Sequence, residues 1–211
     1  MRSETREAAL DAAEVLFRRY GYRKTTVEDI AAEAGMSRAT IYLHFRGKEE
    51  IALAWVARIS AERRAALEAI ACSAANPVAR LRRMLVERVL LSFDRASDYS
   101  ESIDDLLAAL RRSLLEQREE SHAAEAGVFA EVIRQGQRAG ALARGDPAAA
   151  ARLLVLVTNA LLPYSLGRRD LGDREAVAAR AEGIAALALD GLRTRTAARN
   201  GANADGGNTG E

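Results

Sequence analysis

The chain has 211 residues, of which 49% are hydrophobic and 29% are charged, and its formal net charge is +1. This length allows one large or two small domains, and the composition lies outside the ranges typical of disordered and membrane-embedded chains. Prolines are few, and the residues Ala, Leu, Arg and Glu, which favour helices, recur throughout. Residues that favour strands never alternate for more than a few positions. We therefore expect an all-α protein.

Cysteine and histidine are too scarce for an internal disulfide or a structural zinc site, because Cys72 is the single cysteine and there are two histidines. We accordingly expect no metal and no cofactor. The N-terminal segment MRSETREAAL contains acids where a secretion signal needs an apolar run, and the apolar run at 153–162 is too short to span a bilayer. The expected location is the cytoplasm, with no membrane partner.

The N-terminal part of the chain predicts three short helices. A stripe of apolar residues runs over 4–20, and Gly21 is placed to end that helix. Thr26 is a suitable N-cap for a second helix, which Gly35 ends. Ser37 is a suitable N-cap for the third.

The second and third helices have the small and apolar residues of a helix-turn-helix. Ala31 is small where the two helices cross, and Ile30 and Ile41 are apolar at their junction. A large side chain in place of Ala31 would hold the helices apart. We therefore expect residues 1–50 to form a helix-turn-helix DNA-binding domain.

The third helix presents a surface that suits the major groove of DNA. It combines a guanidinium, a hydroxyl, a phenol and apolar groups, carried by Arg38, Ala39, Thr40, Tyr42 and Leu43. A further helix begins near Gly47, and its free N–H groups together with Lys48 are expected to form an anion site for a phosphate.

Residues 51–195 predict a larger helical domain, and the Gly- and Asn-rich residues 196–211 a disordered tail. Within the domain, apolar residues at helical spacing predict helices at 51–72, 78–93, 101–118, 123–136, 148–166 and 174–193. The second half of the helix at 78–93 adds apolar residues beyond one stripe, so we expect it to be buried on more than one side.

The sequence up to Glu49 resembles the N-terminal signature of the TetR family, and the resemblance covers about the first 55 residues. The matching elements are Tyr20-Gly21-Tyr22, Thr25-Thr26, Ile30-Ala31, Gly35-Met36-Ser37, Thr40-Ile41-Tyr42-Leu43-His44-Phe45 and Lys48-Glu49. The resemblance implies an effector-binding and dimerisation domain after the DNA-binding domain.

The resemblance also implies roles for single residues. Phosphate contacts are implied for Thr25 or Thr26, Tyr42, His44 and Lys48, and base contacts for Arg38, Ala39 and Thr40, with Ser37 opening the recognition helix. The family often has a basic or polar residue just after the paired threonines. This chain has Val27 and Glu28 there, which puts a base contact from the second helix in doubt.

Each of these residues also has a purely structural interpretation. Thr26 and Ser37 would cap helices in any helical protein. His44 taken alone would be an ordinary surface histidine, and Arg38 a solvated arginine.

The apolar helices of the larger domain predict a cavity for an apolar or aromatic small molecule. The candidate lining residues are Met84, Phe93, Tyr99, Phe129, Asn159 and Tyr164. The alternative is that the aromatic residues among them, like Trp55, belong to the core.

The apolar stretch 153–162 predicts a homodimer, because one side of it would otherwise expose a large apolar patch to water. Small residues in the last helix allow a second helix to approach closely. The expected interface residues are Leu154, Leu161, Ala181, Ile184 and Ala188. A two-fold axis would place the recognition helices about 34–36 Å apart, which suits a palindromic operator on double-stranded DNA.

The leading hypothesis is a sequence-specific transcriptional regulator, a repressor that a small-molecule effector releases from its operator. One alternative is a similar DNA binder without ligand control, acting as an activator or a chromosome-binding protein. Another is an all-helical enzyme with a DNA-binding module. The sequence has no motif typical of a catalytic site, so we expect no enzymatic activity.

Overall fold

The computed structural model describes residues 2–98, 102–162 and 172–193, and these residues are mostly helical. The helices are α1 (Arg2–Lys24), α2 (Val27–Glu33), α3 (Arg38–Tyr42), α4 (Lys48–Ala71), α5 (Pro77–Asp98), α6 (Ser102–Arg138), α7 (Pro147–Thr158), the 3-10 helix η1 (Asn159–Leu161) and α9 (Arg174–Leu192). No strand is formed within these ranges, so the predicted all-α class is confirmed. None of the described helices combines the length and the apolar character needed to cross a membrane.

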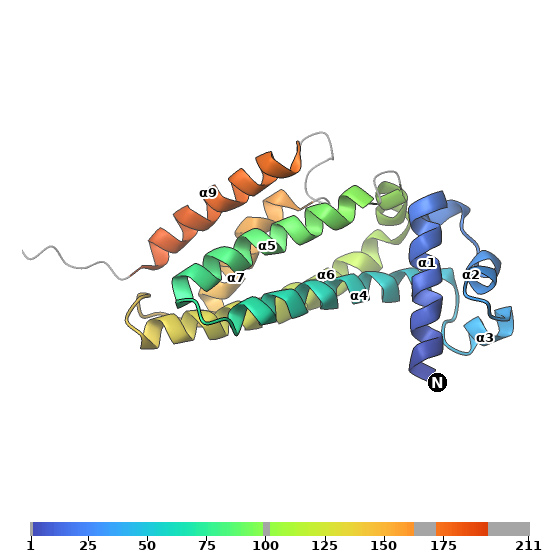
Figure 1. Ribbon diagram of the computed structural model, residues 1–211, viewed down its shortest axis with the longest axis horizontal. Helices are drawn as coiled ribbons and strands as arrows, with labels where there is room; N and C mark the ends of the chain where they lie inside the picture. The colour runs from blue at the N-terminus through green and yellow to red at the C-terminus, as the bar shows by residue number, and fades with distance from the viewer. Residues whose placement is uncertain (1, 99–101, 163–171, 194–211) are drawn as a thin grey trace, which may run out of the picture.

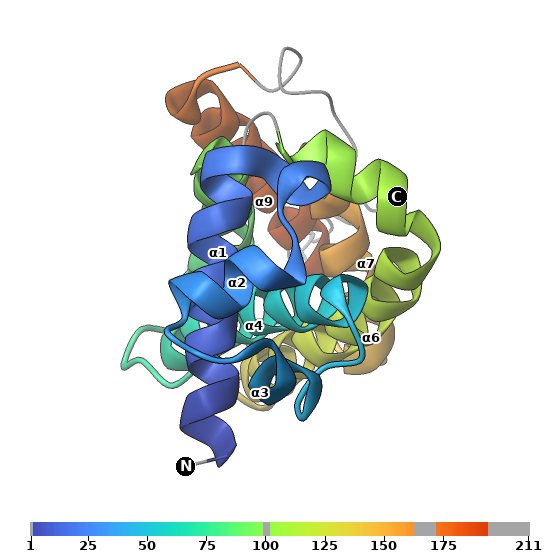
Figure 2. The same ribbon diagram turned by 90° about the vertical axis from the view of Figure 1, so that its right-hand side faces the viewer.

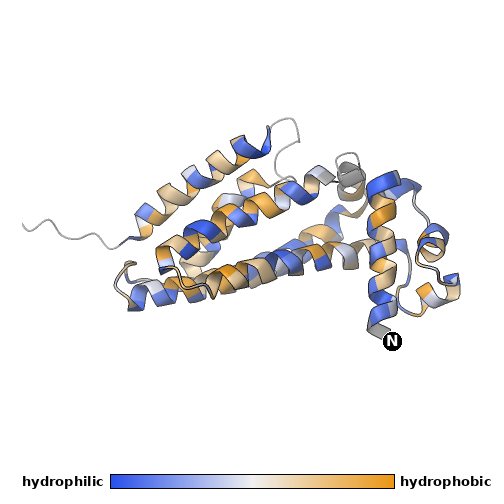
Figure 3. Cartoon of the chain, viewed as in Figure 1, coloured by the Kyte–Doolittle hydropathy of each residue, from blue (hydrophilic) through white to orange (hydrophobic). Residues whose placement is uncertain are grey.

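The helices form an elongated bundle with a small domain at one end (Figure 1). Helices α4, α5, α6, α7 and α9 run along the bundle, whereas α1 crosses its end and separates it from α2 and α3. Figure 3 shows hydrophobic residues concentrated on the inward sides of the bundle helices. The fold thus holds the α2–α3 pair at one tip of the molecule.

The N-terminal core joins α1, α2, α3 and the first turns of α4. Its buried residues include Leu10, Phe17, Ile30, Ile41 and Trp55. The predicted end of the first helix is marked by Gly21, whose backbone has φ 81°, a conformation that a residue with a Cβ rarely adopts. Two residues of α6, Leu106 and Leu110, complete this core, so the bundle and the N-terminal domain share apolar contacts.

Two helix boundaries differ from the prediction. The helices expected at 101–118 and 123–136 form the single helix α6, with non-helical backbone only at Leu110 (φ −120°, ψ 20°). No Gly or Pro occurs at 119–122 to end it. Helix α7 ends at Thr158 instead of continuing to 166, and Leu162 is extended. A residue that precedes a proline is driven out of the helical region.

A buried ion network joins the bundle helices. The Arg88 side chain of α5 is fully buried, and its Nε donates to Glu125 Oε2 at 2.7 Å. The other carboxylate oxygen of Glu125 accepts from Arg63 Nε of α4 at 2.7 Å. Arg88 also donates to Thr158 Oγ1 at 2.8 Å and to Asn159 Oδ1 at 2.9 Å. One carboxylate therefore holds two guanidiniums, and four helices are connected through it.

The Glu125 carboxylate stays ionised at neutral pH. Burial alone would raise the pKa of Glu125, but the Arg88 and Arg63 guanidiniums outweigh it and hold that pKa below its usual range. Arg88 occupies a core position of the helix predicted at 78–93, whose second half is buried on several sides as expected.

Helix α9 lies along α5 and completes the bundle (Figure 1). Two ion pairs connect the helices, Arg82 with Glu182 at 2.6 Å and Arg174 with Asp94 at 2.8 Å. Ala181 and Ala185 of α9 are fully buried. The small residues of this helix thus serve packing within the chain.

For three of the five predicted interface residues, the prediction that they face a partner is wrong. Leu154, Leu161 and Ala181 are buried within the protomer's own core. The periodicity of the apolar stretch did not reveal which of its sides faces the bundle. Ile184 and Ala188 are partly exposed.

We expect Glu125→Gln to lower the free energy of unfolding by about 3–5 kcal/mol, because it leaves two arginines without their shared counter-charge in the core. Chemical denaturation would measure this. Glu120→Gln on the exposed side of the same helix is the matched control, and equal effects of the two substitutions would contradict the assignment.

Candidate nucleic-acid interface and ligand cavity

Helices α2 and α3 form the predicted helix-turn-helix. Thr26 caps α2 through a capping box: its Oγ1 accepts from Asp29 N at 3.1 Å, and Asp29 Oδ2 accepts from Thr26 N at 2.8 Å. Ser37 caps α3, with its Oγ accepting from Thr40 N at 3.1 Å. Ala31 is buried where the helices meet. The predicted N-caps are confirmed.

The outer side of α3 is open to solvent at the tip of the molecule (Figure 2). Arg38, Ala39 and Tyr42 are exposed, and Leu43, just after the helix, is 80% exposed. The structure thus brings together most of the residues predicted to face DNA.

Arg38 is already paired in this arrangement. Its Nη1 lies 2.7 Å from Glu28 Oε1 of α2, and its Nη2 donates to Tyr42 Oη at 3.4 Å. Glu28 therefore orients the guanidinium across the two helices. Contact between Arg38 and a base edge requires exchange of this exposed ion pair, which is weak in water.

Two predicted phosphate contacts have structural roles. Thr25 is 1% exposed, and its Oγ1 donates to Gly21 O at 2.9 Å, so its hydroxyl stabilises the end of α1 and does not face DNA. Lys48 Nζ donates to Tyr22 O at 2.9 Å and to Arg23 O at 3.3 Å. Burial lowers the pKa of Lys48.

Lys48 thereby joins the start of α4 to the end of α1. Its Nζ also lies 4.5 Å from the centre of the Tyr22 ring, a cation–π contact. His44, the last of the predicted phosphate contacts, is half-buried beside α3. Lysine has three ammonium donors, so a phosphate contact by Lys48 stays a prediction alongside its structural role.

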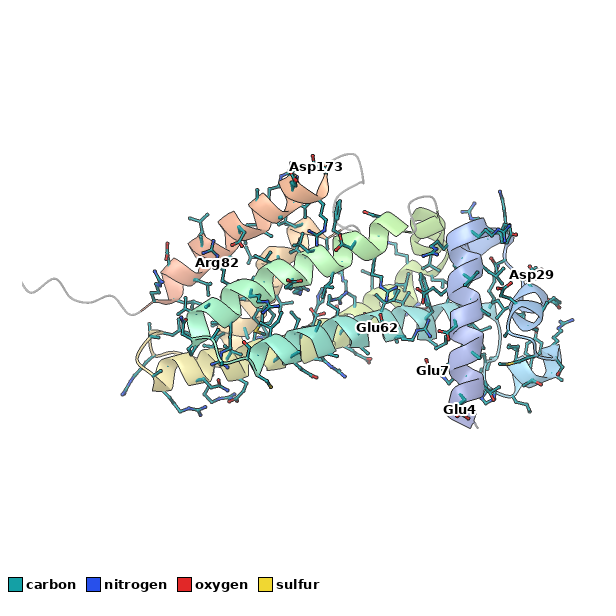
Figure 4. All side chains as sticks on the ribbon, viewed as in Figure 1. Glu4, Glu7, Asp29, Glu62, Arg82 and Asp173 are labelled. Carbon is teal, nitrogen blue, oxygen red and sulfur yellow. The ribbon has the colours of Figure 1, made fainter. Side chains whose placement is uncertain are left out.

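Ion pairs fasten α1 to the bundle. Arg58 of α4 lies 2.6 Å from Asp11 and 2.7 Å from Glu14. Arg95 of α5 pairs with Glu14 at 3.0 Å and with Glu62 of α4. Figure 4 shows Glu62 on α4, between α1 and the far end of the bundle. The orientation of the N-terminal domain thus depends on arginines of the bundle.

A cavity of about 600 Å³ lies where α1 meets the bundle, bounded by α1, α4, α5 and α6. Its apolar lining includes Phe17, Tyr22, Trp55, Ile59, Leu106 and Leu114, and its polar lining includes Arg63, Ser92, Gln117, Arg118, Ser121 and His122. The volume suits a small organic molecule. The cavity touches both the N-terminal domain and the buried ion network.

None of the four predicted lining residues that the structure describes lines this cavity. Met84 and Phe129 are fully buried in the bundle core, Phe93 packs against another part of that core, and Asn159 binds Arg88. Tyr99 and Tyr164 lie outside the described residues. Aromatic residues do line the cavity, but they are Phe17, Tyr22 and Trp55 of α1 and α4. A further signal in the sequence is the recurrence of Arg and His at helical spacing along α6.

His122 connects the cavity to the ion network. Asn159 Oδ1 accepts from Arg88, so its Nδ2 is the group that faces His122 Nδ1, at 3.4 Å. Nδ1 is therefore the acceptor, and the ring proton sits on Nε2. Burial and the nearby Arg88 lower the pKa of His122 to about 4. The imidazole is neutral at physiological pH.

Comparison with known proteins agrees with this geometry. Residues 9–55 match the sequence model of bacterial regulatory proteins of the tetR family. The repressor BepR of Brucella suis is 47% identical over 49 residues, which are 23% of this chain and 23% of BepR. The chain thus covers less than a quarter of that relative's length, and the sequence match is confined to the N-terminal part.

Solved structures extend the likeness to the whole chain. One similar structure is SmeT, the repressor of the Stenotrophomonas maltophilia multidrug efflux pump SmeDEF. In its complex with triclosan, SmeT has a TM-score of 0.66 and 26% identity to this chain. The match covers 92% of this chain and 93% of SmeT. A TetR-family regulator from Pectobacterium atrosepticum has a TM-score of 0.72 and 26% identity, over 92% of this chain and 96% of that protein.

The fold and the site define a helix-turn-helix protein with a cavity-containing helical domain. Its N-terminal residues match the tetR family model, and its fold is similar to that of solved TetR-family regulators.

The buried histidine predicts a pH dependence of stability. Between pH 6.5 and about 4 the unfolded chain binds a proton at His122 that the folded chain excludes, so the free energy of unfolding falls as the pH falls through this window. His122→Gln should make that fall shallower in denaturation curves measured at several pH values. His44→Gln, at the other histidine, is the matched control. An equal change in both variants would contradict the assignment.

Proposed function

We propose that this protein is a sequence-specific DNA-binding transcriptional regulator and not an enzyme, and that it works as a repressor in the cytoplasm. The observation that carries the proposal is the exposed side of α3, with Arg38, Tyr42 and Leu43 at the tip of a helix-turn-helix. A helix of this kind enters the major groove and reads base edges. BepR and SmeT, which this chain resembles, are both described as repressors.

We further propose that a small molecule in the cavity controls DNA binding. SmeT has been solved with triclosan, and the cavity of this chain contacts Phe17 and Tyr22 of α1. Tyr22 in turn is held by Lys48 at the start of α4. A ligand that favours another arrangement of α1 would shift the population away from the DNA-binding form. This ligand control distinguishes the proposal from a constitutive DNA binder.

The protein should act as a homodimer on a palindromic operator. Leu153, Leu156 and Val157 of α7 and Leu187 of α9 are 65%, 63%, 41% and 79% exposed. A neighbouring group of exposed apolar side chains is typical of an interface. These residues replace Leu154, Leu161 and Ala181 in the proposed dimer interface. The two protomers would be related by a two-fold axis.

Arg38→Ala should weaken operator binding by about 1–3 kcal/mol and relax the preference at one base-pair position. Fluorescence anisotropy with a set of single-base operator variants would measure this. Arg144→Ala, at an exposed arginine far from α3, is the control. Uniform weakening on every sequence would make Arg38 a phosphate contact, and unchanged binding would remove it from the interface.

Leu156→Glu should yield monomers that fold but bind the operator far more weakly, because a charge in an apolar interface is costly to bury. Analytical ultracentrifugation would give the mass. Val15→Glu, at an apolar residue that is 44% exposed on α1, is the matched control. A dimer that persists in the Leu156 variant would place the interface elsewhere.

A further inference from the structure

The cavity walls are positively charged. Arg63, Arg95, Arg111 and Arg118 line the cavity, and no carboxylate does so among the described lining residues. Arg111 and Arg118 are seven residues apart on α6, with His122 four residues further, so all three share one side of that helix. Glu14 and Glu62, which pair with Arg95, and Glu125, which pairs with Arg63, are not among the described lining residues.

The lining has a polar end and an apolar end. Arg63 Nη1 donates to Ser92 Oγ at 3.4 Å and its Nη2 to Ser121 Oγ at 3.5 Å, and His122 lies next in α6. Phe17 and Trp55 form the other end, with ring centres 5.6 Å apart. Trp55 and Arg63 are separated by eight residues of α4, which corresponds to about 12 Å along the helix.

The polar end gathers several basic side chains around one buried carboxylate. Glu125 is shared by Arg63 and Arg88, so one carboxylate faces two guanidiniums. The Nδ1 of His122 already accepts from Asn159, and its proton sits on Nε2. His122 therefore offers a hydrogen-bond donor and no negative charge. Charge-assisted hydrogen bonds to an anion are strong where water is partly excluded.

We propose that the cavity binds an organic anion with an apolar, aromatic-sized body, its acidic group at the arginines of α4 and α6 and its body against Phe17 and Trp55. This inference rests on the ligand-controlled regulation proposed above and specifies its effector class. It adds an acidic group to the apolar or aromatic effector expected from the sequence. A cation would meet the like charge of the arginines at the polar end, and a neutral analogue would make no charge-assisted hydrogen bond with them.

The same arrangement connects the anion to the N-terminal domain. Arg95 lines the cavity and also pairs with Glu14 of α1 at 3.0 Å. An anion whose acidic group extends to Arg95 competes with Glu14 for this guanidinium, and that competition weakens one of the ion pairs that fasten α1 to the bundle. Ligand charge, and not ligand size alone, then favours release of DNA.

The test compares three probes that share a naphthalene body and carry an anionic, a neutral or a cationic group: 2-naphthoate, 2-naphthylmethanol and 2-naphthylmethylamine. Calorimetry on the full chain measures their binding, and decanoate tests a second body. We expect 2-naphthoate to bind at least about tenfold more tightly than the alcohol, a difference of about 1.4 kcal/mol, and the amine to bind most weakly. Equal or tighter binding of the alcohol or the amine would overturn the proposal, as would failure of both anions to bind.

The site is tested with Arg118→Gln, which should reduce 2-naphthoate affinity about tenfold or more and leave the affinity for the alcohol unchanged. Arg112→Gln is the matched control, because Arg112 is on the same helix, has a 95% exposed side chain and does not line the cavity. Equal losses in both variants would show a general charge effect and overturn the assignment. Circular dichroism and thermal unfolding confirm that each variant is folded.

Operator binding is measured separately, so that the two proposals fail separately. Loss of operator DNA on addition of 2-naphthoate supports both. If the protein binds the anion through Arg118 but binds no operator, the regulator function fails and the ligand class stands. If it binds the operator but prefers the neutral or cationic probe, the ligand class fails and the regulator function stands.

Discussion

The pairing of the Glu125 carboxylate with two arginines is the interaction on which the rest of the structure depends. It is fully buried and accepts from Arg63 of α4 and Arg88 of α5, while Arg88 binds Thr158 and Asn159 at the end of α7. An ion pair in an apolar core gains little stability over well-packed hydrophobic residues. It does define one register for the helices, because any sliding would leave a buried charge unpaired.

The cavity lies where this network meets the N-terminal domain. Arg63 and His122 belong to both the network and the lining, whereas Phe17 and Tyr22 belong to both the lining and the core of the N-terminal domain. A bound molecule therefore contacts the N-terminal domain and the helical bundle at once. Coupling between sites needs such an element that both sites can bias.

Prediction from the sequence succeeded where local chemistry decides the outcome. The N-caps Thr26 and Ser37 and the helix end at Gly21 follow from hydrogen bonds and backbone freedom within a few residues. It failed where distant residues decide. Thr25 carries the same hydroxyl as Thr26 but is buried against Gly21, and nothing in the local pattern distinguishes the two threonines.

The sequence by itself determined the all-α class, the helix-turn-helix and the side of α3 that carries Arg38, because helical periodicity and capping act over one or two turns. Only the tertiary structure decided which side of the stretch 153–162 is exposed and which residues surround the cavity. Arg63, Arg95 and Arg118 are far apart in the chain and look like solvated arginines in the sequence. Their meeting at one cavity depends on the packing of three helices, which no local pattern encodes.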